Sequence, residues 1–216
     1  MVNEGTNVTT GEVRLSYVHL FKPYSAQPEQ DAKYSVTILI PKTDVATKAR
    51  IDAAIAAATQ RGSQDKWNGV VPPILKTPLS DGDGVRQDGT PFGPECRGHW
   101  IMTARSSADR PPEVVDAQLQ PILNQSEVYS GIYGRVNVEF FPYFNAGNKG
   151  IGCSLGCVQK LRDGESLGGS APTAAEAFGA PAGGYGGYVP QAAVPQAAEP
   201  AVYAPRGIDP ITGRPL

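Results

Sequence analysis

Short runs of alternating apolar and polar residues restrict the fold of this chain more than any other feature. In residues 33–40, KYSVTILI, the side chains of Val36, Ile38 and Ile40 share one face, because successive side chains of a strand point to opposite sides. Further runs of this kind occupy residues 13–21, 99–105, 132–141 and 151–158. The pattern predicts half-buried β-strands, of which the first two along the chain are expected to pair.

Prolines and turn residues predict where these strands end. Lys22-Pro23-Tyr24 is expected to end the first strand, because proline has no N–H to donate to a neighbouring strand. Pro142, followed by residues 145–148, is expected to form the turn before the last strand. The strand before that turn is predicted to bury Ile132, Val136, Val138 and Phe140.

One helix is expected early in the chain. Thr43 or Asp44 is a suitable N-cap, the stretch ARIDAAIAAAT is rich in helix formers, and Gly62 is the predicted stop after a helix that ends near Gln60. Its narrow apolar stripe suits it to covering an end or an open side of a barrel.

Residues 62–98 form a long, turn-rich excursion, a type of segment that is usually either functional or disordered. Residues 74–79 within it are a candidate edge strand, and Val114 and Val115 are candidates for another short strand. The total is five or six strands with one or two accessory helices and long loops, which predicts an all-β fold. A five-stranded Greek-key barrel resembling the OB-fold fits best, and a β-sandwich is the alternative.

The composition changes near Gly168, where Gly, Ala and Pro become dominant. Such a segment cannot bury enough apolar surface to offset the entropy of ordering it. We therefore expect a folded domain over residues 1–168 and a disordered tail over residues 169–216.

The net charge of −2 argues against a polycation that binds DNA through bulk charge. Any nucleic-acid site must therefore gather positive charge on one face. The three cysteines, Cys96, Cys153 and Cys157, lack a second metal-ligating pair at suitable spacing, so no metal or other cofactor is expected and they are interpreted as reduced thiols. No signal peptide or membrane span is apparent, which favours a cytoplasmic protein.

Catalytic motifs for phosphate binding, zinc hydrolysis or a serine nucleophile are absent from the sequence. Asp81, Asp83 and Asp88 could bind a divalent metal as in a nuclease, but they lie among glycines, where carboxylates usually shape turns. We therefore expect no enzymatic activity.

Aromatic and basic residues share strand faces, as in proteins that stack bases on rings and bind phosphates with cations. Tyr133, Arg135, Phe141 and Tyr143 fall on one face if Pro142 does not break the alternation. The first strand exposes either Arg14 or the face that carries Tyr17, His19 and Phe21, and Arg105 is closely followed by Arg110. Rings on strands also serve as ordinary packing residues, so this pattern alone does not decide the function.

Glycines line one face of the last strand, at positions 150, 152 and 156. They indicate either strong coiling of a barrel strand, which we favour, or the close approach of another group to the backbone.

Several blocks in order along the chain resemble a family of bacteriophage single-stranded DNA-binding proteins, also known as DUF2815. The blocks are GEVRLSYVHLFKP, KYSVTILIPKTD, DGD, and the long stretch from SEVYSGIYGRVNVEFF to KLRDGESLGG. The resemblance covers roughly residues 10–178. It implies an OB-fold that coats single-stranded DNA during phage replication, recombination and repair. Many single-strand-binding proteins have a strongly acidic C-terminal tip, whereas this chain ends in GIDPITGRPL.

The resemblance and the strand faces together predict a DNA-binding face with little sequence preference. The residues expected to contact DNA are Arg14, Lys33, Trp67, Trp100, Arg105, Tyr133, Arg135, Phe141, Tyr143, Lys149 and Lys160. Single-stranded DNA is the expected partner, and the tail is a candidate docking site for replication or recombination proteins. The alternatives are a metal-dependent nuclease that uses Asp81 and Asp83, and an adaptor that acts through its tail.

Overall fold

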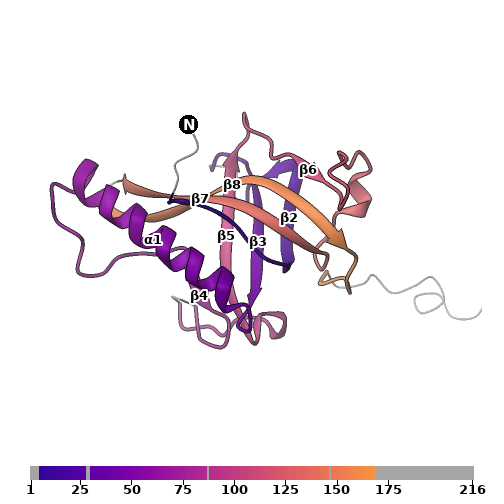
Figure 1. Ribbon diagram of the computed structural model, residues 1–216, viewed down its shortest axis with the longest axis horizontal. Helices are drawn as coiled ribbons and strands as arrows, with labels where there is room; N and C mark the ends of the chain where they lie inside the picture. Colours follow the sequence, from indigo (N-terminus) through magenta and orange to yellow (C-terminus); the bar gives the residue numbers. More distant parts are fainter. Residues whose placement is uncertain (1–4, 28–29, 87, 146, 169–216) are drawn as a thin grey trace, which may run out of the picture. The chain divides into compact units, whose positions relative to one another are not determined.

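Five strands close into a ring in the computed structural model, which describes residues 5–27, 30–86, 88–145 and 147–168. In ring order these are β2 (Val13–Tyr24), β3 (Lys33–Pro41), β5 (His99–Ser107), β8 (Asn148–Arg162) and β7 (Tyr133–Asn145), which returns to β2 (Figure 1). Neighbours are antiparallel except β5 and β8, which pair in parallel. The ring confirms the predicted five-stranded barrel and rules out the β-sandwich.

Three shorter strands extend the sheet beyond the ring. They are β1 (Asn7–Thr9) on β7, β4 (Leu79–Asp81) on β5 and β6 (Val114–Val115) on β8. The predicted strand at residues 114–115 is confirmed, whereas the one at 74–79 is wrong except for its last residue. The expected total of five or six is also wrong, because strands of two or three residues are too short to show alternation.

The first strand alternates as predicted only over its first half. Val13 and Leu15 are buried, but Tyr17 has a backbone φ of 47° and is 62% exposed, after which Leu20 is buried again. A register shift against β3 lies at this point, so a β-bulge exchanges the two faces. Regular alternation along residues 13–21 would put Tyr17 on the same face as Val13 and Leu15, and the bulge prevents this. The strand also continues past Pro23 to Tyr24, which pairs with Lys33.

The β7–β8 hairpin buries the four residues predicted for it, since Ile132, Val136, Val138 and Phe140 are fully buried. Pro142 was expected to form part of the turn, but it is a buried residue inside β7 and pairs with Ile151. A strand accepts proline where no ladder hydrogen bond needs its N–H. The turn comes after Asn145, in agreement with the other part of the prediction, which placed it at residues 145–148.

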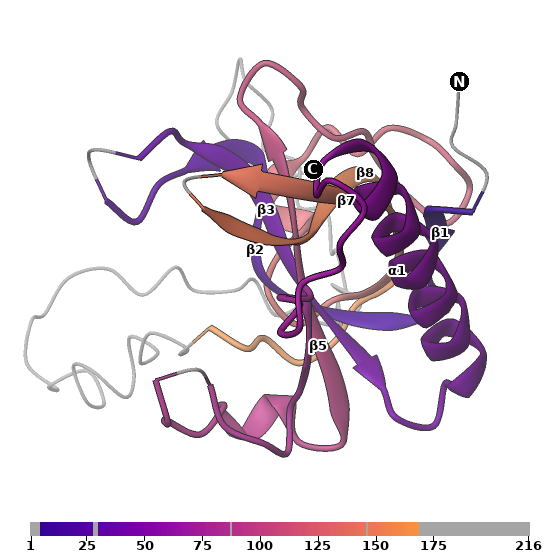
Figure 2. The same cartoon turned by 90° about the vertical axis from the view of Figure 1, so that its left-hand side faces the viewer.

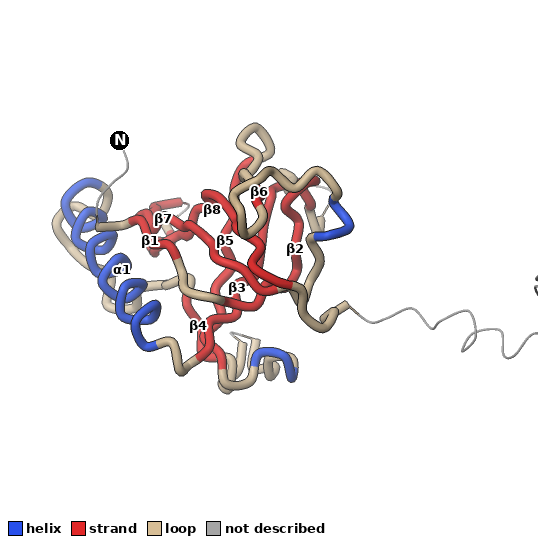
Figure 3. The backbone as a smooth tube through the Cα atoms, turned by 45° about the vertical axis from the view of Figure 1, so that its right-hand side comes forward, coloured by secondary structure: helices blue, strands red, loops and turns tan. Residues whose placement is uncertain are grey.

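The predicted N-cap of the helix is confirmed, because the Asp44 carboxylate accepts a hydrogen bond from the backbone N–H of Thr47 at 2.9 Å. The helix α1 (Val45–Asp65) lies beside β1 and β7 (Figures 1 and 2). Figure 3 shows the same arrangement, with the strands in red and α1 in blue at one side. No described helix is long and apolar enough to cross a membrane.

The helix does not stop at Gly62, which is a buried residue in its last turn. A Cβ at Gly62 would lie 2.7 Å from the Trp67 ring and 2.7 Å from the Cβ of Pro142. Trp67 is 1% exposed, and its Nε1 donates to the Tyr143 carbonyl at 3.1 Å. Gly62 therefore serves close packing rather than helix termination. Trp67 belongs to the core, and its ring has no exposed face in this structure on which a base could stack.

The prediction of a disordered tail concerns residues that lie outside the described ones, as does the suggested docking of partners on that tail.

The packing of Gly62 leads to a test by substitution. Gly62→Ala improves helix propensity by about 1 kcal/mol, but it adds a methyl group where no space exists, which costs about 1–3 kcal/mol. We expect a lower free energy of unfolding in denaturant titrations. Gln64→Ala, on the exposed face of the same turn, is the control and should be nearly neutral. A more stable Gly62→Ala variant would contradict this account.

The three free thiols differ in exposure, which gives a second prediction. Burial raises the pKa of Cys153 to about 12 and also raises the pKa of Cys96, whereas Cys157 is exposed. Because the thiolate is the reactive form, native protein at about pH 8 should present one fast thiol to DTNB and two protected ones. Cys157→Ser should remove the fast reaction. Rapid reaction of all three before unfolding would show that Cys96 and Cys153 are accessible.

Candidate nucleic-acid interface

Two depressions of about 780 and 850 Å³ lie on the outer face of β3 and β5. They share Lys33, Thr103 and Arg105, so we treat them together as the barrel groove. The first depression continues to the loop between β2 and β3, and the second to the β7–β8 hairpin. The groove thus crosses the middle of the barrel and reaches a loop at each side.

Strand alternation directs polar side chains into this groove. Ser35 pairs with Arg105, and Thr37 pairs with Thr103, whose hydroxyl lies 3.2 Å from that of Thr37. The residues between them, Val36 and Ala104, are fully buried in the core. The same alternation that fills the barrel therefore builds a hydroxyl-rich floor outside it.

Positive charge is concentrated along the groove. Its lining contains five exposed cations, Lys33, Lys76, Arg86, Arg105 and Arg110, against the acids Asp31 and Glu139. Within the described ranges, none of these five cations forms an ion pair with a carboxylate. The paired cations, Lys42, Lys48, Lys160 and Arg162, all lie outside the lining. Charge is thus segregated although the chain as a whole is slightly acidic.

Two aromatic rings of β7 lie across glycines of β8 in the second depression. Phe141 pairs with Gly152 and Tyr143 with Gly150. A Cβ at Gly152 would be 2.5 Å from the Phe141 ring, and one at Gly150 would be 2.6 Å from the Tyr143 hydroxyl. The glycines therefore permit close approach of the rings. The sequence analysis favoured strong coiling of the strand and kept this close approach as the alternative. Phe141 remains 41% exposed, so part of its ring is available to a ligand.

Three more rings line the first depression. His19 and Tyr24 stack on each other with centroids 4.4 Å apart and planes 9° from parallel. Tyr17 lines the same depression from the bulge in β2. Rings therefore occupy both halves of the groove, with Lys33 and Arg105 in its shared centre.

Four of the eleven predicted contact residues line the groove, namely Lys33, Arg105, Phe141 and Tyr143. Lys149 lies at the tip of the β7–β8 hairpin, with its Nζ 5.6 Å from the centroid of the Phe144 ring. It is close in sequence to the lining residues of β8 but does not itself line either depression.

Arg14 and Tyr133 belong to a separate surface cluster. The guanidinium of Arg162 lies 3.6 Å from the Tyr133 ring centroid, and Arg162 also pairs with Glu12. Arg14 lies 5.8 Å from the same centroid and donates to the Glu165 carbonyl at 2.8 Å. The Tyr133 ring is thus contacted by the protein's own cations, and it lies outside both depressions.

The remaining predicted residues also contact the protein rather than the groove. Arg135 donates to the Thr10 carbonyl at 3.2 Å, and Lys160 donates to the Glu127 carbonyl and pairs with Asp163, each at 2.8 Å. Lys42 and Lys48 lie over the Trp100 ring, with each Nζ within 5 Å of its centroid. The predicted residues Arg135, Lys160 and Trp100 were assigned by strand face alone. A strand face does not show which part of a curved sheet carries the groove.

Six residues of the groove lining were not among the predicted DNA contacts. They are Tyr17, His19, Tyr24, Lys76, Arg86 and Arg110. The sequence left undecided whether the first strand exposes the face with Tyr17 and His19 or the face with Arg14. It also showed that Arg110 closely follows Arg105. Lys76 and Arg86 come from the long excursion, where no periodic pattern indicates direction. A search for bulges could have found Tyr17, but bulges leave little trace in a single sequence.

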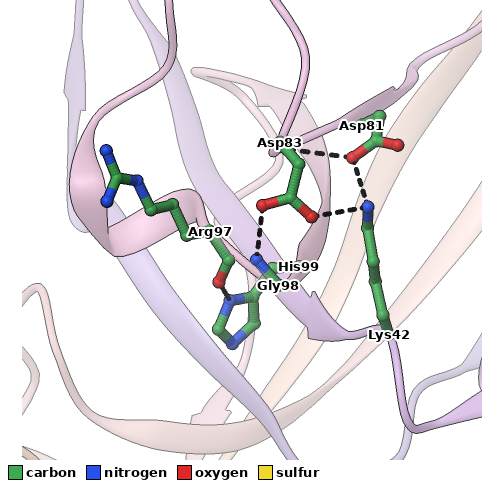
Figure 4. Close-up of polar contacts among 6 residues, drawn as sticks. All are labelled: Lys42, Asp81, Asp83, Arg97, Gly98 and His99. Carbon is green, nitrogen blue, oxygen red and sulfur yellow. Dashed lines mark hydrogen bonds and ion pairs between the residues drawn. The ribbon is translucent and has the colours of Figure 1, made fainter.

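The carboxylates suggested for a nuclease hold a lysine instead (Figure 4). Lys42 Nζ lies 2.6 Å from Asp81 and 2.7 Å from Asp83. Asp81 also accepts from the backbone N–H of Asp83, and Asp83 accepts from that of Gly98. The hydrogen bond from Lys42 lowers the pKa of both carboxyls. These contacts confirm the interpretation of both residues as turn-forming carboxylates, and the described residues contain no group of three or more metal-ligating side chains.

Solved structures with similar folds include single-stranded DNA-binding proteins of bacteriophages. The protein of bacteriophage Enc34 in complex with single-stranded DNA matches with a TM-score of 0.64 and 30% identity, over 76% of this chain and 90% of that one. Another structure of the Enc34 single-stranded DNA-binding protein matches with a TM-score of 0.62 and 29% identity, over 80% of this chain and 90% of that one. The single-stranded DNA-binding protein gp2.5 of bacteriophage T7, at 15% identity over 85% of this chain and all of that one, shares the fold with a TM-score of 0.55.

Sequence comparisons identify the family. Protein p50 of Acyrthosiphon pisum secondary endosymbiont phage 1 is 29% identical over 79% of this chain and 91% of its own length. Residues 6–185 match the model of the family described as Enterobacter phage Enc34, ssDNA-binding protein. Because this match spans most of the chain and agrees with the closed barrel, the protein belongs to the Enc34 ssDNA-binding protein family.

Proposed function

We propose that this protein binds and coats single-stranded DNA through the barrel groove, with little sequence preference. The observation that carries the proposal is that five cations without a carboxylate partner among the described residues line one groove together with exposed rings, in a chain whose net charge is −2. In OB-folds, oligonucleotides bind across the second and third strands and between the two loops that flank them. Here those strands are β3 and β5, which carry the groove.

The division of labour follows from the chemistry of the lining. Lys33, Arg105 and Arg110 neutralise phosphates, whose condensed counterions are released on binding. Bases stack on Phe141 and Tyr143, and each stacked base contributes about 1–3 kcal/mol. Every base has a π-face, so stacking of this kind discriminates little between sequences.

The biological setting is inferred from the relatives. The matching family and the matching solved structures are those of phage proteins named for binding single-stranded DNA, and one was solved in complex with it. We infer the same role here, as a non-enzymatic coat during phage DNA replication, recombination or repair in the cytoplasm of an infected cell. The nuclease alternative loses its support because Asp81 and Asp83 bind Lys42. The adaptor alternative depends on the tail, which lies outside the described residues.

Salt dependence tests which cations contact phosphates. For single strands, the logarithm of affinity falls with the logarithm of salt concentration by about 0.7 per neutralised phosphate. Arg105→Ala should weaken binding to oligo-dT and reduce this slope by about 0.7, as measured by fluorescence titration at several salt concentrations. Arg135→Ala is the matched control, because Arg135 is exposed on the barrel but lines neither depression. A larger effect from Arg135→Ala would place the DNA elsewhere.

Ring placement gives a second test. Gly152→Ala forces the Phe141 ring away from β8, and we expect oligo-dT binding about five- to tenfold weaker because a displaced ring stacks poorly. Gly156→Ala is the matched control on the same strand, since its Cβ would meet Asn137, which does not line the groove. Thermal unfolding of both variants separates lost stacking from lost stability. Equal affinities for the two variants would remove Phe141 from the binding site.

A further inference from the structure

The long excursion between α1 and β5 ends in an arm, residues 82–98, of which the structure describes all but residue 87. Arg86 belongs to this arm and lines the first depression of the groove. Val85 beside it is 65% exposed, and among the described residues of the arm only Gly82 and Cys96 are buried. Segments with so few buried contacts open locally at little cost in free energy. The position of Arg86 therefore depends on the contacts that pin the arm to the barrel.

Three side chains join the two ends of the arm to the end of β3 (Figure 4). Lys42 follows β3 directly, and its ammonium lies 2.6 Å from Asp81 and 2.7 Å from Asp83. The other carboxylate oxygen of Asp83 accepts the backbone N–H of Gly98 at 2.9 Å. The Gly98 carbonyl in turn accepts the backbone N–H of Lys42 at 2.9 Å. We call Lys42, Asp81 and Asp83 the clip.

The clip has a firm floor but lies open to solvent. The Lys42 ammonium lies 4.9 Å from the centroid of the Trp100 ring. Gly82 is buried, and a Cβ there would collide with the carbonyl oxygen of Cys96. The side chains of the clip are 32–45% exposed, and ion pairs of this kind add little to global stability. The effect of the clip is therefore expected to be local, on the position of the arm.

The arm between its ends is a small folded unit. The backbone N–H of Arg86 donates to the Thr90 carbonyl at 2.7 Å, and the Arg86 guanidinium lies 5.4 Å from the centroid of the Phe92 ring. Phe92 packs on Leu39 and Ile101 of the outer barrel surface. A change at the ends of the arm is therefore expected to move Arg86 with it.

We propose that the clip positions Arg86 for DNA binding, although no residue of the clip lines the groove. The inference rests on the proposed function and extends it to residues outside the site. Asp83 is the decisive member, because it bonds both the ammonium of Lys42 and the backbone of Gly98, the last residue of the arm. An acidic residue thus supports the binding of a polyanion, which is the opposite of its direct electrostatic effect.

The sign of one substitution tests this role. Asp83→Ala removes a negative charge, so direct electrostatics alone predicts tighter binding of DNA. The clip predicts the reverse: affinity for oligo-dT, measured by fluorescence titration, should fall about two- to fivefold as Arg86 loses a phosphate contact. Arg86→Ala should cause a similar loss. Asp83→Ala should add nothing in an Arg86→Ala background, but it should add in full in an Arg105→Ala background.

Asp52→Ala is the matched control, because Asp52 is 52% exposed and pairs with Lys48 at 2.6 Å on α1. It also removes one paired carboxylate, and it should not weaken binding. Hydrogen exchange in the free protein tests the arm without DNA. In Asp83→Ala the anchoring amides of Gly82 and Lys42 should exchange faster, whereas the core amide of Val36 should not change.

Tighter or unchanged binding by Asp83→Ala, or a loss that persists in the Arg86→Ala background, would overturn the positioning role. Unchanged exchange at Gly82 and Lys42 would also overturn it, as would faster exchange at Val36, which would indicate a global loss of stability. Failure of the unaltered protein to bind oligo-dT would instead contradict the proposed function, while the exchange experiment would still report on the arm.

Discussion

Closure of the barrel between β5 and β8 is the constraint on which the other features depend. The two strands pair in parallel through Arg105 and Ser154, whereas β8 is held over most of its length by the hairpin with β7. This junction brings Arg105 of β5 next to the glycines and rings of the hairpin, because Ser154, Gly152 and Phe141 line the same depression. An open sheet would leave these groups on strands that do not meet. The fold and the groove are therefore consequences of one closing contact.

Closure also explains how a slightly acidic chain can offer a cationic surface. Acids outside the groove bind particular cations: Asp81 and Asp83 hold Lys42, and Asp163 holds Lys160. The carboxylates of these pairs are exposed while the lysines are partly covered, and ion pairs open to solvent contribute little to stability individually. They neutralise Lys42 and Lys160, whereas the five cations of the groove have no carboxylate partner among the described residues. Net charge alone is thus a poor guide to binding when pairing separates free cations from occupied ones.

The barrel could be predicted from the sequence, because every second residue of its strands is apolar and buried. Examples are Val36, Ile38, Val136 and Val138. The sequence was insufficient for the site, because strand alternation assigns a face but not a position around a closed sheet. Arg135 and Arg105 look equivalent by pattern, yet one contacts the Thr10 carbonyl and the other lines the groove. Trp67 failed for another reason: its burial depends on Gly62 and Pro142, which are distant from one another in sequence. The bulge that exposes Tyr17 is likewise set by packing rather than by local propensity.

Mapping of backbone amide chemical shifts on the isotope-labelled full chain, titrated with oligo-dT, tests the location of the DNA most directly. The groove account predicts that the affected amides cluster in three stretches, residues 33–37, 103–110 and 141–154, with smaller changes at residues 17–24. It also predicts that amides of β1 and of residues 135–138 stay near their unbound positions. Shifts concentrated on β1 and around Arg135, with the β3–β5 face unchanged, would contradict it.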